Sequence, residues 1–384
     1  MSEDLSPQDL KQLVSSAFPR REGDRGLAIL VDVPDPQVPD NERWNARRRM
    51  AKRWADGLEE VRGDLGLAEV SLIYYPNVHS NNADLPGAGY RWTGDPGTVD
   101  AAGLETDGHP TPFETLFSDH QILLAPTEFS TTAPLKLNAK TYGFRAATMP
   151  GFSADMIASL RLDYGEINRR VLAVKEKLDE AAGAQVEFLV HGSFHRLHLD
   201  LRHRTAHASG GFFPEPATAG NLPSGEAYIV PYEGERGEAS RSSGTLPVQL
   251  EGEVVLYRIE NNRAVEVLSM GPVSAAEADK IRSEPAYANL AEAGFGVLAA
   301  FGVKPIGEML LDEKLGLHIA FGRSDHFGGS VGIKDFSSPE KVVHIDRIYI
   351  PETQADVQVR FVDLTFEDGR TERLMEAGDY TIFG

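Results

Sequence analysis

The chain has 384 residues, of which 41% are hydrophobic and 25% charged, and this composition is that of a globular protein with room for two domains. It contains no cysteine, which excludes disulfides, thiol nucleophiles and cysteine-ligated metals, so any bound metal must be held by oxygen and imidazole ligands. Acidic residues outnumber basic ones, 58 to 38, and the formal charge of -20 disfavours nucleic acid as a partner.

The N-terminal segment 1–16 is polar and lacks the apolar run of a signal peptide. No stretch of about eighteen apolar residues follows anywhere in the chain. We therefore expect a cytoplasmic protein without a membrane partner.

The first half of the chain alternates strand-like and helix-like segments. Strands are predicted at 26–33, 70–76 and 121–127, and helices at 43–62 and 163–183. This alternation is typical of an α/β domain with a mainly parallel sheet covered on both faces. No glycine-rich turn follows the first strand, so a nucleotide site of the usual kind is not expected.

Two further segments of this half are read from their composition, and the role of the second one stays open. The basic run 43–54, RWNARRRMAKRW, is interpreted as a helix with an apolar side and a solvated arginine side. Segment 77–112 is rich in Pro, Gly, Asn and Asp without periodicity, and it is predicted to be a long surface loop.

From about residue 186 the pattern changes to short strand-like runs separated by turns. These runs are 186–192, 228–232, 254–259, 264–270, 317–322, 343–350 and 357–366. One helix is predicted at 274–294, opened by Ser274 and Glu277 as a capping box. The chain is therefore predicted to fold as an α/β domain of residues 1–185, followed by a mainly β (α+β) metal-binding domain of residues 186–384.

Segment 191–211 is rich in histidine but is not the preferred metal site. Its histidines are His191, His195, His198, His203 and His207. They do not fall on a common strand face, and no carboxylate cluster accompanies them. A polar strand and turn at the domain junction is the preferred interpretation.

The strongest chemical signal is the HID tripeptide at 344–346. Residues i and i+2 of a strand share a face, so His344 and Asp346 are expected side by side within an apolar strand. Burying such a pair is costly without a partner, and a cation would supply one. His318 lies in a second apolar run, and Glu313 lies in the turn that leads into it.

Two further glutamates are candidate ligands. Glu226 ends the turn NLPSGE, just before an apolar run. Glu292 falls at the C-terminal end of the predicted helix, where the helix dipole disfavours a carboxylate and a nearby cation would remove the conflict. Each candidate also has an ordinary explanation as a core histidine or an exposed acid, and turn positions explain Glu308 and His326 adequately.

These segments resemble the leucyl aminopeptidase T-type metallopeptidases, peptidase family M29. GNLPSGEAYIVP, LDEKLGLHIAFG, HID and AEAGFG are similar to the family's ligand-bearing segments, and ILLAPTEFSTTAPLKLNAKTYGFRAATMPGF with DYGEI extends the resemblance over most of the chain, apart from 77–112. The resemblance implies two divalent cations (Zn, Co or Mn). It implies as their ligands Glu226, Glu292, Glu313, His318, His344 and Asp346.

The resemblance further implies an aminopeptidase-like hydrolase, a homodimer, acting on a peptide or small-molecule substrate. Two cations that share a carboxylate can activate a bridging water for cleavage of an amide bond. Glu226 and Glu292 are the predicted catalytic residues, with Glu226 as the bridging ligand. Which glutamate serves as the general base stays open.

The chain departs from the family pattern at three places. Residues 323–326 stand where the peptidases carry a tyrosine shortly after the histidine ligand, and the segment between Glu292 and His318 is shorter. His195 and Arg196 replace a threonine-aspartate pair.

Two alternative functions therefore stay open. A mononuclear Fe(II) dioxygenase of the ring-cleaving type would use His318, His344 and Asp346 as two histidines and one carboxylate. The other alternative is a binding protein without catalytic activity, which would have the same fold and a vestigial site.

Overall fold

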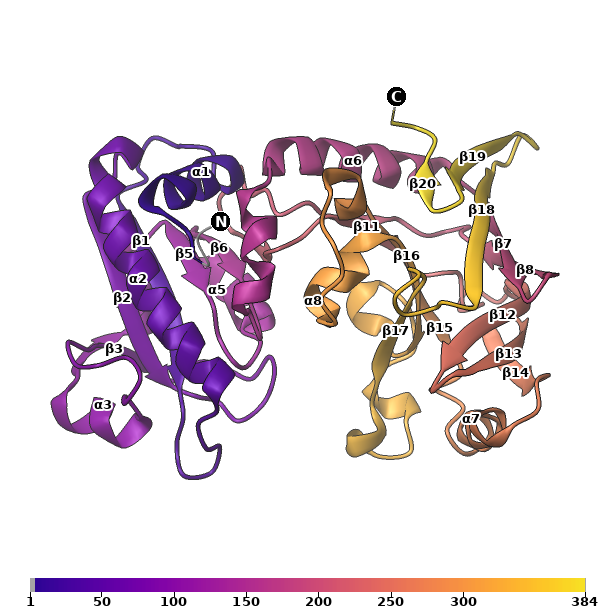
Figure 1. The fold of residues 1–384 in the computed structure, drawn as a ribbon, viewed down its shortest axis with the longest axis horizontal. Helices are drawn as coiled ribbons and strands as arrows, with labels where there is room; N and C mark the ends of the chain where they lie inside the picture. The colour runs from indigo at the N-terminus through magenta and orange to yellow at the C-terminus, as the bar shows by residue number, and fades with distance from the viewer. Residues whose placement is uncertain (1–3, 384) are drawn as a thin grey trace. The chain divides into compact units, whose positions relative to one another are not determined.

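The computed structural model describes residues 4–383. They form two compact units, the first of residues 4–168 and 211–224, the second of residues 169–210 and 225–383 (Figure 1). The chain crosses between the units three times, whereas the predicted division near residue 185 has a single crossing. Segment 211–224 returns to the first unit. A division of the sequence into two consecutive domains does not include such a return.

The first unit contains a sheet in the strand order β10-β6-β5-β1-β2-β3-β4. Its strands are β1 (Gly26–Val33), β2 (Glu69–Pro76), β3 (Ala88–Arg91), β4 (His109–Pro112), β5 (Ile122–Ala125), β6 (Arg145–Thr148) and β10 (Thr218–Asn221). The pairs from β10 to β2 are parallel, and β3 pairs antiparallel with both β2 and β4. The predicted mainly parallel sheet is confirmed.

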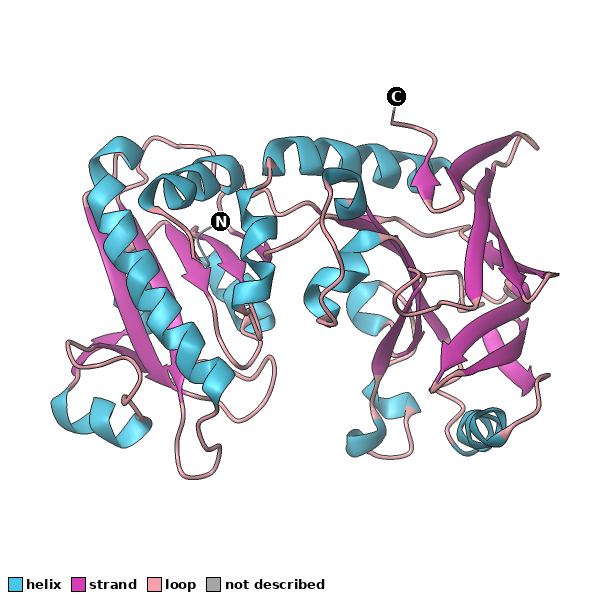
Figure 2. Cartoon of the chain, viewed as in Figure 1, coloured by secondary structure: helices cyan, strands magenta, loops and turns pink. Residues whose placement is uncertain are grey.

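Short connections and helices surround this sheet (Figure 2). The helices are α1 (Pro7–Ala17), α2 (Glu42–Leu65), α3 (Ala101–Asp107), α4 (Phe113–Asp119), α5 (Thr132–Tyr142) and the 3₁₀ helix η1 (Ala154–Arg161), and α6 (Tyr164–Glu180) leads into the second unit. Every residue of β1 is buried, as expected for a central parallel strand with helices on both faces.

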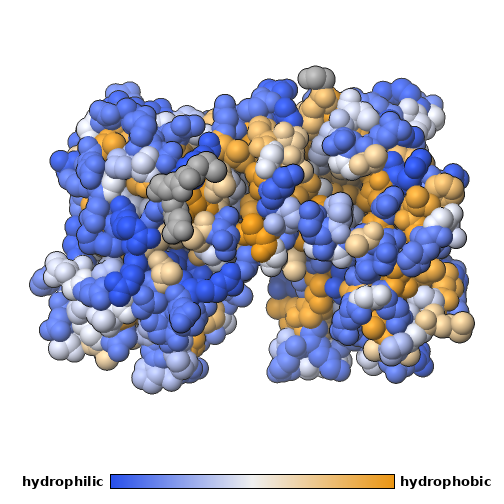
Figure 3. Space-filling view, in the orientation of Figure 1, coloured by the Kyte–Doolittle hydropathy of each residue, from blue (hydrophilic) through white to orange (hydrophobic). Residues whose placement is uncertain are grey.

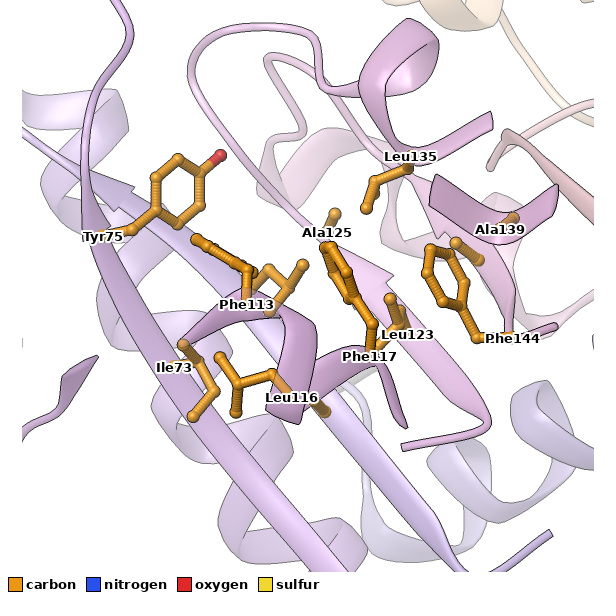
Figure 4. Packing of buried hydrophobic residues seen from close by; sticks show 13 residues of the cluster. Ile73, Tyr75, Phe113, Leu116, Phe117, Leu123, Ala125, Leu135, Ala139 and Phe144 are labelled. Carbon is orange, nitrogen blue, oxygen red and sulfur yellow. The ribbon is translucent and has the colours of Figure 1, made fainter. Parts of the chain in front are cut away.

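Aromatic rings fill the core between this sheet and its helices (Figure 4). Phe117 of α4 lies 4.9 Å from Phe144 and 5.2 Å from Phe113 between ring centroids, and Phe113 in turn meets Tyr75 of β2 at 5.8 Å. Aliphatic side chains of β1, β5 and α5 complete the cluster.

The prediction of a structureless loop over 77–112 is wrong. This segment contains β3, α3 and β4, and β3 extends the sheet beside β2. Asp100 caps α3 by accepting a hydrogen bond from the backbone of Gly103 at 2.7 Å. Elements of four and seven residues are too short to show a period, so the turn-rich composition hid them.

The predicted solvated arginine side of α2 is wrong at two positions. Trp44 and Trp54 are buried as expected, but Arg47 and Arg48 are buried as well. Arg47 donates to Glu128 and to the carbonyl of Phe152, and Arg48 pairs with Asp40. The periodicity of the helix could not predict these arginines as buried, because the carboxylates that compensate their charge lie outside the helix, Asp40 before it and Glu128 far along the chain.

The second unit is mainly β, as predicted. One sheet has the order β17-β16-β15-β11-β9, and the other the order β14-β13-β12-β8-β7-β18-β19-β20. Their strands are β7 (Gly183–Val190), β8 (Ser193–Asp200), β9 (His207–Ser209), β11 (Glu226–Ile229), β12 (Ser243–Leu250), β13 (Glu253–Glu260), β14 (Arg263–Val267), β15 (Leu290–Gly296), β16 (Leu317–Gly322), β17 (His344–Ile348), β18 (Val357–Thr365), β19 (Thr371–Glu376) and β20 (Asp379–Tyr380). Two α-helices, α7 (Pro272–Ser283) and α8 (Met309–Asp312), interrupt these strands.

The helix predicted at 274–294 ends at residue 283, and Glu292 lies on strand β15. Pro285 follows the end of α7, and a proline disfavours helical geometry at the residue before it. The predicted capping box is also wrong. Ser274 bonds to Glu253, and Glu277 accepts hydrogen bonds from the hydroxyls of two tyrosines.

Hydrophilic residues cover most of the molecular face shown in Figure 3, in keeping with the charge of -20. Within residues 4–383, no helix has the length and apolar character needed to cross a membrane.

Arg145 of β6 supports the first prediction. Its buried guanidinium pairs with Asp24 at 2.7 Å and donates to the carbonyl of Phe213 at 3.0 Å, so it ties the returning segment to the first unit. Arg145→Met should lower the free energy of unfolding of this unit by about 3–5 kcal/mol, because Asp24 would stay buried without its partner. Calorimetric or urea-induced unfolding measures the change.

The matched control is Lys52→Met, which breaks the exposed pair between Lys52 and Asp56. It should change stability by less than about 1 kcal/mol. Equal effects of the two substitutions would contradict the assigned role of Arg145.

Candidate metal centre

The five-stranded sheet of the second unit gathers acidic and imidazole side chains on one face. Directly opposed residues of an antiparallel sheet share a face, as do residues i and i+2 of one strand. His318 opposes Gly294, Ala320 opposes both Glu292 and Asp346, and Gly322 opposes His344. Glu226 opposes Gly296 and so joins the same face from β11.

A bulge in β15 sets the orientation of Glu292. Leu290 pairs with Phe321, yet Glu292 pairs with Ala320, so one extra residue stands between these two pairs. Without the bulge, Leu290 and Glu292 would share a face. The bulge leaves Leu290 opposite an apolar residue and turns Glu292 toward the histidines.

Small residues on this face make room for the imidazole of His318. A Cβ atom at Gly294 would lie 1.9 Å from Nε2 of His318, so the imidazole would have to move from its present position. Glycine weakens a strand interior, and it is found where another group must approach closely. Gly294 therefore belongs to the construction of the centre.

The side chains converge into two groups that share Glu292. One group is Glu226, Glu292 and His318, the other is Glu292, His344 and Asp346, and the ligand atoms within each group lie within 4.8 Å of one another. Nε2 of His318 lies 3.3 Å from Oε1 of Glu292. Nε2 of His344 lies 3.1 Å from Oε2 of Glu292 and 3.5 Å from Oδ1 of Asp346.

The structure thus brings five of the six predicted ligands into these groups, and it places Glu313 outside both. Glu292, and not the predicted Glu226, is the carboxylate common to the two groups. Glu313 begins a 3₁₀ turn, and its carboxylate pairs with the neighbouring Lys314.

Lys314 is a buried cation that sequence analysis missed. Its side chain is 2% exposed, and Nζ lies 2.5 Å from Oε1 of Glu226 while also bonding to Glu313. Burial opposes its charge, but the two carboxylates outweigh burial and raise the pKa of Lys314 above its usual value. In LDEKLG the acidic neighbours suggested a solvated turn, and only the pairing of β11 with β15 reveals the contact.

The positive charges of the histidines and the negative charges of the carboxylates stabilise one another. Burial lowers the pKa of His318, but its bond to Glu292 and the charge of Glu226 prevail and raise it to about 9. Burial likewise opposes charge on His344, but Asp346 and Glu292 raise its pKa to about 11. Burial would raise the pKa of Glu292, yet hydrogen bonds from both imidazoles hold it well below its usual range.

Unsatisfied atoms indicate that the donor set fits a metal ion. Among residues 4–383, Oε2 of Glu226 is buried and accepts no hydrogen bond, and its ion-pair partner is Nε2 of His318 at 3.6 Å. Nδ1 of His344 donates to the carbonyl of Arg323 at 2.8 Å, which leaves Nε2 to face the carboxylates. A second hydrogen bond of this kind orients the histidine ligands of metals.

Aromatic rings border the centre. Tyr228, two residues after Glu226, stacks on His207 at 5.1 Å and meets Phe327 edge-on at 4.9 Å. Phe327 and His326 both lie 5.3 Å from His344 between ring centroids. Burial, followed by the charges of Glu292 and Glu226, raises the pKa of Tyr228, so its phenol keeps its proton.

Of the histidine-rich segment, only His207 is part of this aromatic border, and none of its histidines belongs to a metal-ligand group within residues 4–383. Glu308 precedes α8, also outside both groups.

Comparison with known proteins gives a likeness of fold. No family model matches the chain, and no curated protein matches it either. The structure of 2,5-dihydroxypyridine dioxygenase from Pseudomonas putida KT2440 aligns with a TM-score of 0.60 at 15% identity, covering 98% of this chain and 96% of that chain. Wild-type AmpT from Thermus thermophilus aligns with a TM-score of 0.53 at 15% identity, covering 98% of both chains.

The raised pKa values of His318 and His344 support the second prediction. Both imidazoles are protonated on both nitrogens at pH 7 when no cation is bound. A cation that binds Nε2 must therefore displace the proton on that nitrogen. The affinity for Zn(II) should therefore fall as pH is lowered from 7.5 to 6, by up to about tenfold per pH unit for each proton displaced. Calorimetric titration in buffers of different ionisation enthalpy measures the released protons.

His195→Gln is the control, because His195 lies outside both groups, and it should leave the proton release unchanged. Binding with the same affinity at both ends of this pH range would show that the histidines are not ligands.

Proposed function

We propose that this chain is a metal-dependent hydrolase that cleaves an amide bond in a peptide or peptide-like small molecule. The observation that carries the proposal is the convergence of Glu226, Glu292, His318, His344 and Asp346 on one buried sheet face. A divalent cation bound there would polarise a carbonyl and make a water molecule acidic enough to react near neutral pH.

Glu226 is the proposed general base. Lys314 holds Oε1 of this carboxylate at 2.5 Å, while Oε2 accepts no hydrogen bond within residues 4–383. A carboxylate with one oxygen fixed by an ammonium and the other without a hydrogen bond is oriented to take a proton from water. Glu292 is assigned instead to cation binding, because it belongs to both ligand groups.

Tyr228 is the proposed hydrogen-bond donor to the oxyanion. Its ring is held between His207 and Phe327, and it follows Glu226 by two residues on the same strand face. A neutral phenol beside the reacting carbonyl can stabilise the negative charge that develops there. Such a donor would compensate for the tyrosine that the resembling peptidases carry after their histidine ligand.

The fold supports this proposal without deciding the reaction. AmpT, an aminopeptidase of the M29 family, has the same fold, but the dihydroxypyridine dioxygenase shares it as well. Two histidines and one carboxylate would be enough for the dioxygenase, and the centre contains further carboxylates. These favour hydrolysis, because a hydrolase needs a proton acceptor besides its metal ligands.

The third prediction tests hydrolysis. Full-length protein supplied with Zn(II), Co(II) or Mn(II) should release the N-terminal residue from short peptides, as followed by chromatography, and excess chelator should abolish release. Glu226→Gln should lower kcat by about 10²–10⁴-fold with the cation retained, as expected for loss of a general base. Glu292→Gln should lose the cation itself.

Glu266→Gln is the matched control, since Glu266 forms an exposed pair with Arg258 on the other sheet. It should keep both metal and activity. Turnover that persists undiminished in excess chelator would refute a metal-dependent hydrolase.

A second candidate function is a mononuclear Fe(II) dioxygenase. The specific observation in its favour is that Lys314 pairs with Glu226 and Glu313, which leaves Glu292 and Asp346 as the carboxylates beside the two histidines that have no lysine partner. The dihydroxypyridine dioxygenase shares the fold.

The fourth prediction separates the two candidates. Protein loaded anaerobically with Fe(II) and mixed with 2,5-dihydroxypyridine should consume no oxygen above the rate of free iron if the chain is a hydrolase. An oxygen electrode and the ultraviolet absorbance of the ring measure this. Stoichiometric oxygen uptake with loss of the ring absorbance would transfer the proposal to the dioxygenase.

A further inference from the structure

Lys314 occupies the centre as a cation that belongs to the chain itself. Its ammonium bonds to both Glu226 and Glu313, and all three side chains are largely buried, at 2%, 8% and 16% exposed. A buried ammonium requires such partners, because an unpaired charge would be costly to remove from water. These two carboxylates therefore compensate the charge of the lysine.

The backbone fixes the lysine at this place. Buried Asp312 accepts hydrogen bonds from the backbone of Ile306 and Gly307, both at 2.9 Å, and so anchors the turn that carries Lys314. Gly296 lets this turn approach β15, since a Cβ atom there would lie 2.1 Å from the carbonyl carbon of Lys314. Because Gly296 opposes Glu226 in the sheet, the turn delivers the ammonium to that glutamate.

We propose that the ammonium of Lys314 takes the place of one of the two divalent cations that the family resemblance implies, so that the chain binds a single divalent cation. This inference rests on the proposed function for the presence of that cation. The cation is bound by the group that the lysine does not contact, which is Glu292, His344 and Asp346.

The spacing of the donors that Lys314 does not contact suits one ion. Nε2 of His344 lies 3.1 Å from Oε2 of Glu292 and 3.5 Å from Oδ1 of Asp346. Ligand atoms at about 2.0–2.1 Å from one tetrahedral ion are separated by roughly 3.4 Å. One imidazole and two carboxylates can hold a divalent ion of the zinc type with the fourth position left for water, whereas the other group includes Glu226, which the ammonium contacts.

Charge balance favours the same stoichiometry. The centre contains the carboxylates of Glu226, Glu292, Glu313 and Asp346, and one ammonium with one divalent ion brings three positive charges against these four negative ones. A second divalent ion would bring five. It would also share Glu226 with the ammonium, and the two positive centres would repel each other across one carboxylate.

The experiment counts ions on the full-length protein. Metal-free protein is titrated with Co(II) by calorimetry, and after dialysis the cobalt per chain is measured by inductively coupled plasma mass spectrometry. The expected result is one ion per chain for the wild type. Lys314→Met, which keeps the length of the stem and removes the charge, should raise the count to two, because Glu226 and Glu313 become available.

Lys304→Met is the control for removal of an exposed lysine, and it should keep one ion. Two ions on the wild type would overturn the inference and leave the hydrolase proposal standing, whereas no ion at all would overturn both. A count of one in folded Lys314→Met would show that the ammonium is not what excludes the second ion. The wild-type count decides the matter by itself where the variant fails to fold.

Discussion

The centre depends on one constraint, which is that carboxylates buried side by side must be matched by positive charge. Glu226, Glu292 and Asp346 stand on one face of a sheet, where ligand atoms of Glu292 lie within 4.8 Å of those of each of the other two. The chain supplies compensation from two sources, the imidazoles on β16 and β17 and the ammonium of Lys314. The shifted pKa values of both histidines follow from this arrangement.

The part of the centre with local causes could be predicted from the sequence. The two-residue period of a strand placed His344 and Asp346 on one face, and the structure bears out that geometry. Glu292 was misplaced because NLAEAG contains good helix formers, while the force that makes it a strand is its pairing with β11 and β16. Lys314 was missed for the same reason, since its contact with Glu226 joins residues that are far apart in the sequence.

The first unit shows the same division between local and long-range causes. Its mainly parallel sheet could be predicted, because apolar runs such as 26–33 must be covered on both faces. The buried arginines of α2 could not, because a charged residue is expected at the surface unless its partner is known. The partner of Arg48 is Asp40, which stands before the helix, and the partner of Arg47 is Glu128, which follows β5.

The location of the ligands on paired strands has a consequence for how the centre forms. Glycine and a bulge weaken the polar face of the sheet, but the opposite face is apolar, with Phe321 packed against Tyr257 at 5.2 Å and Tyr287 at 5.7 Å. The apolar face can therefore stabilise the strands while the internal ion pairs compensate the carboxylates. In small zinc domains the metal supplies the folding energy. Here the sheet and the internal ion pairs already hold the candidate ligands together, so a cation bound as proposed would displace protons from histidine without having to assemble the site.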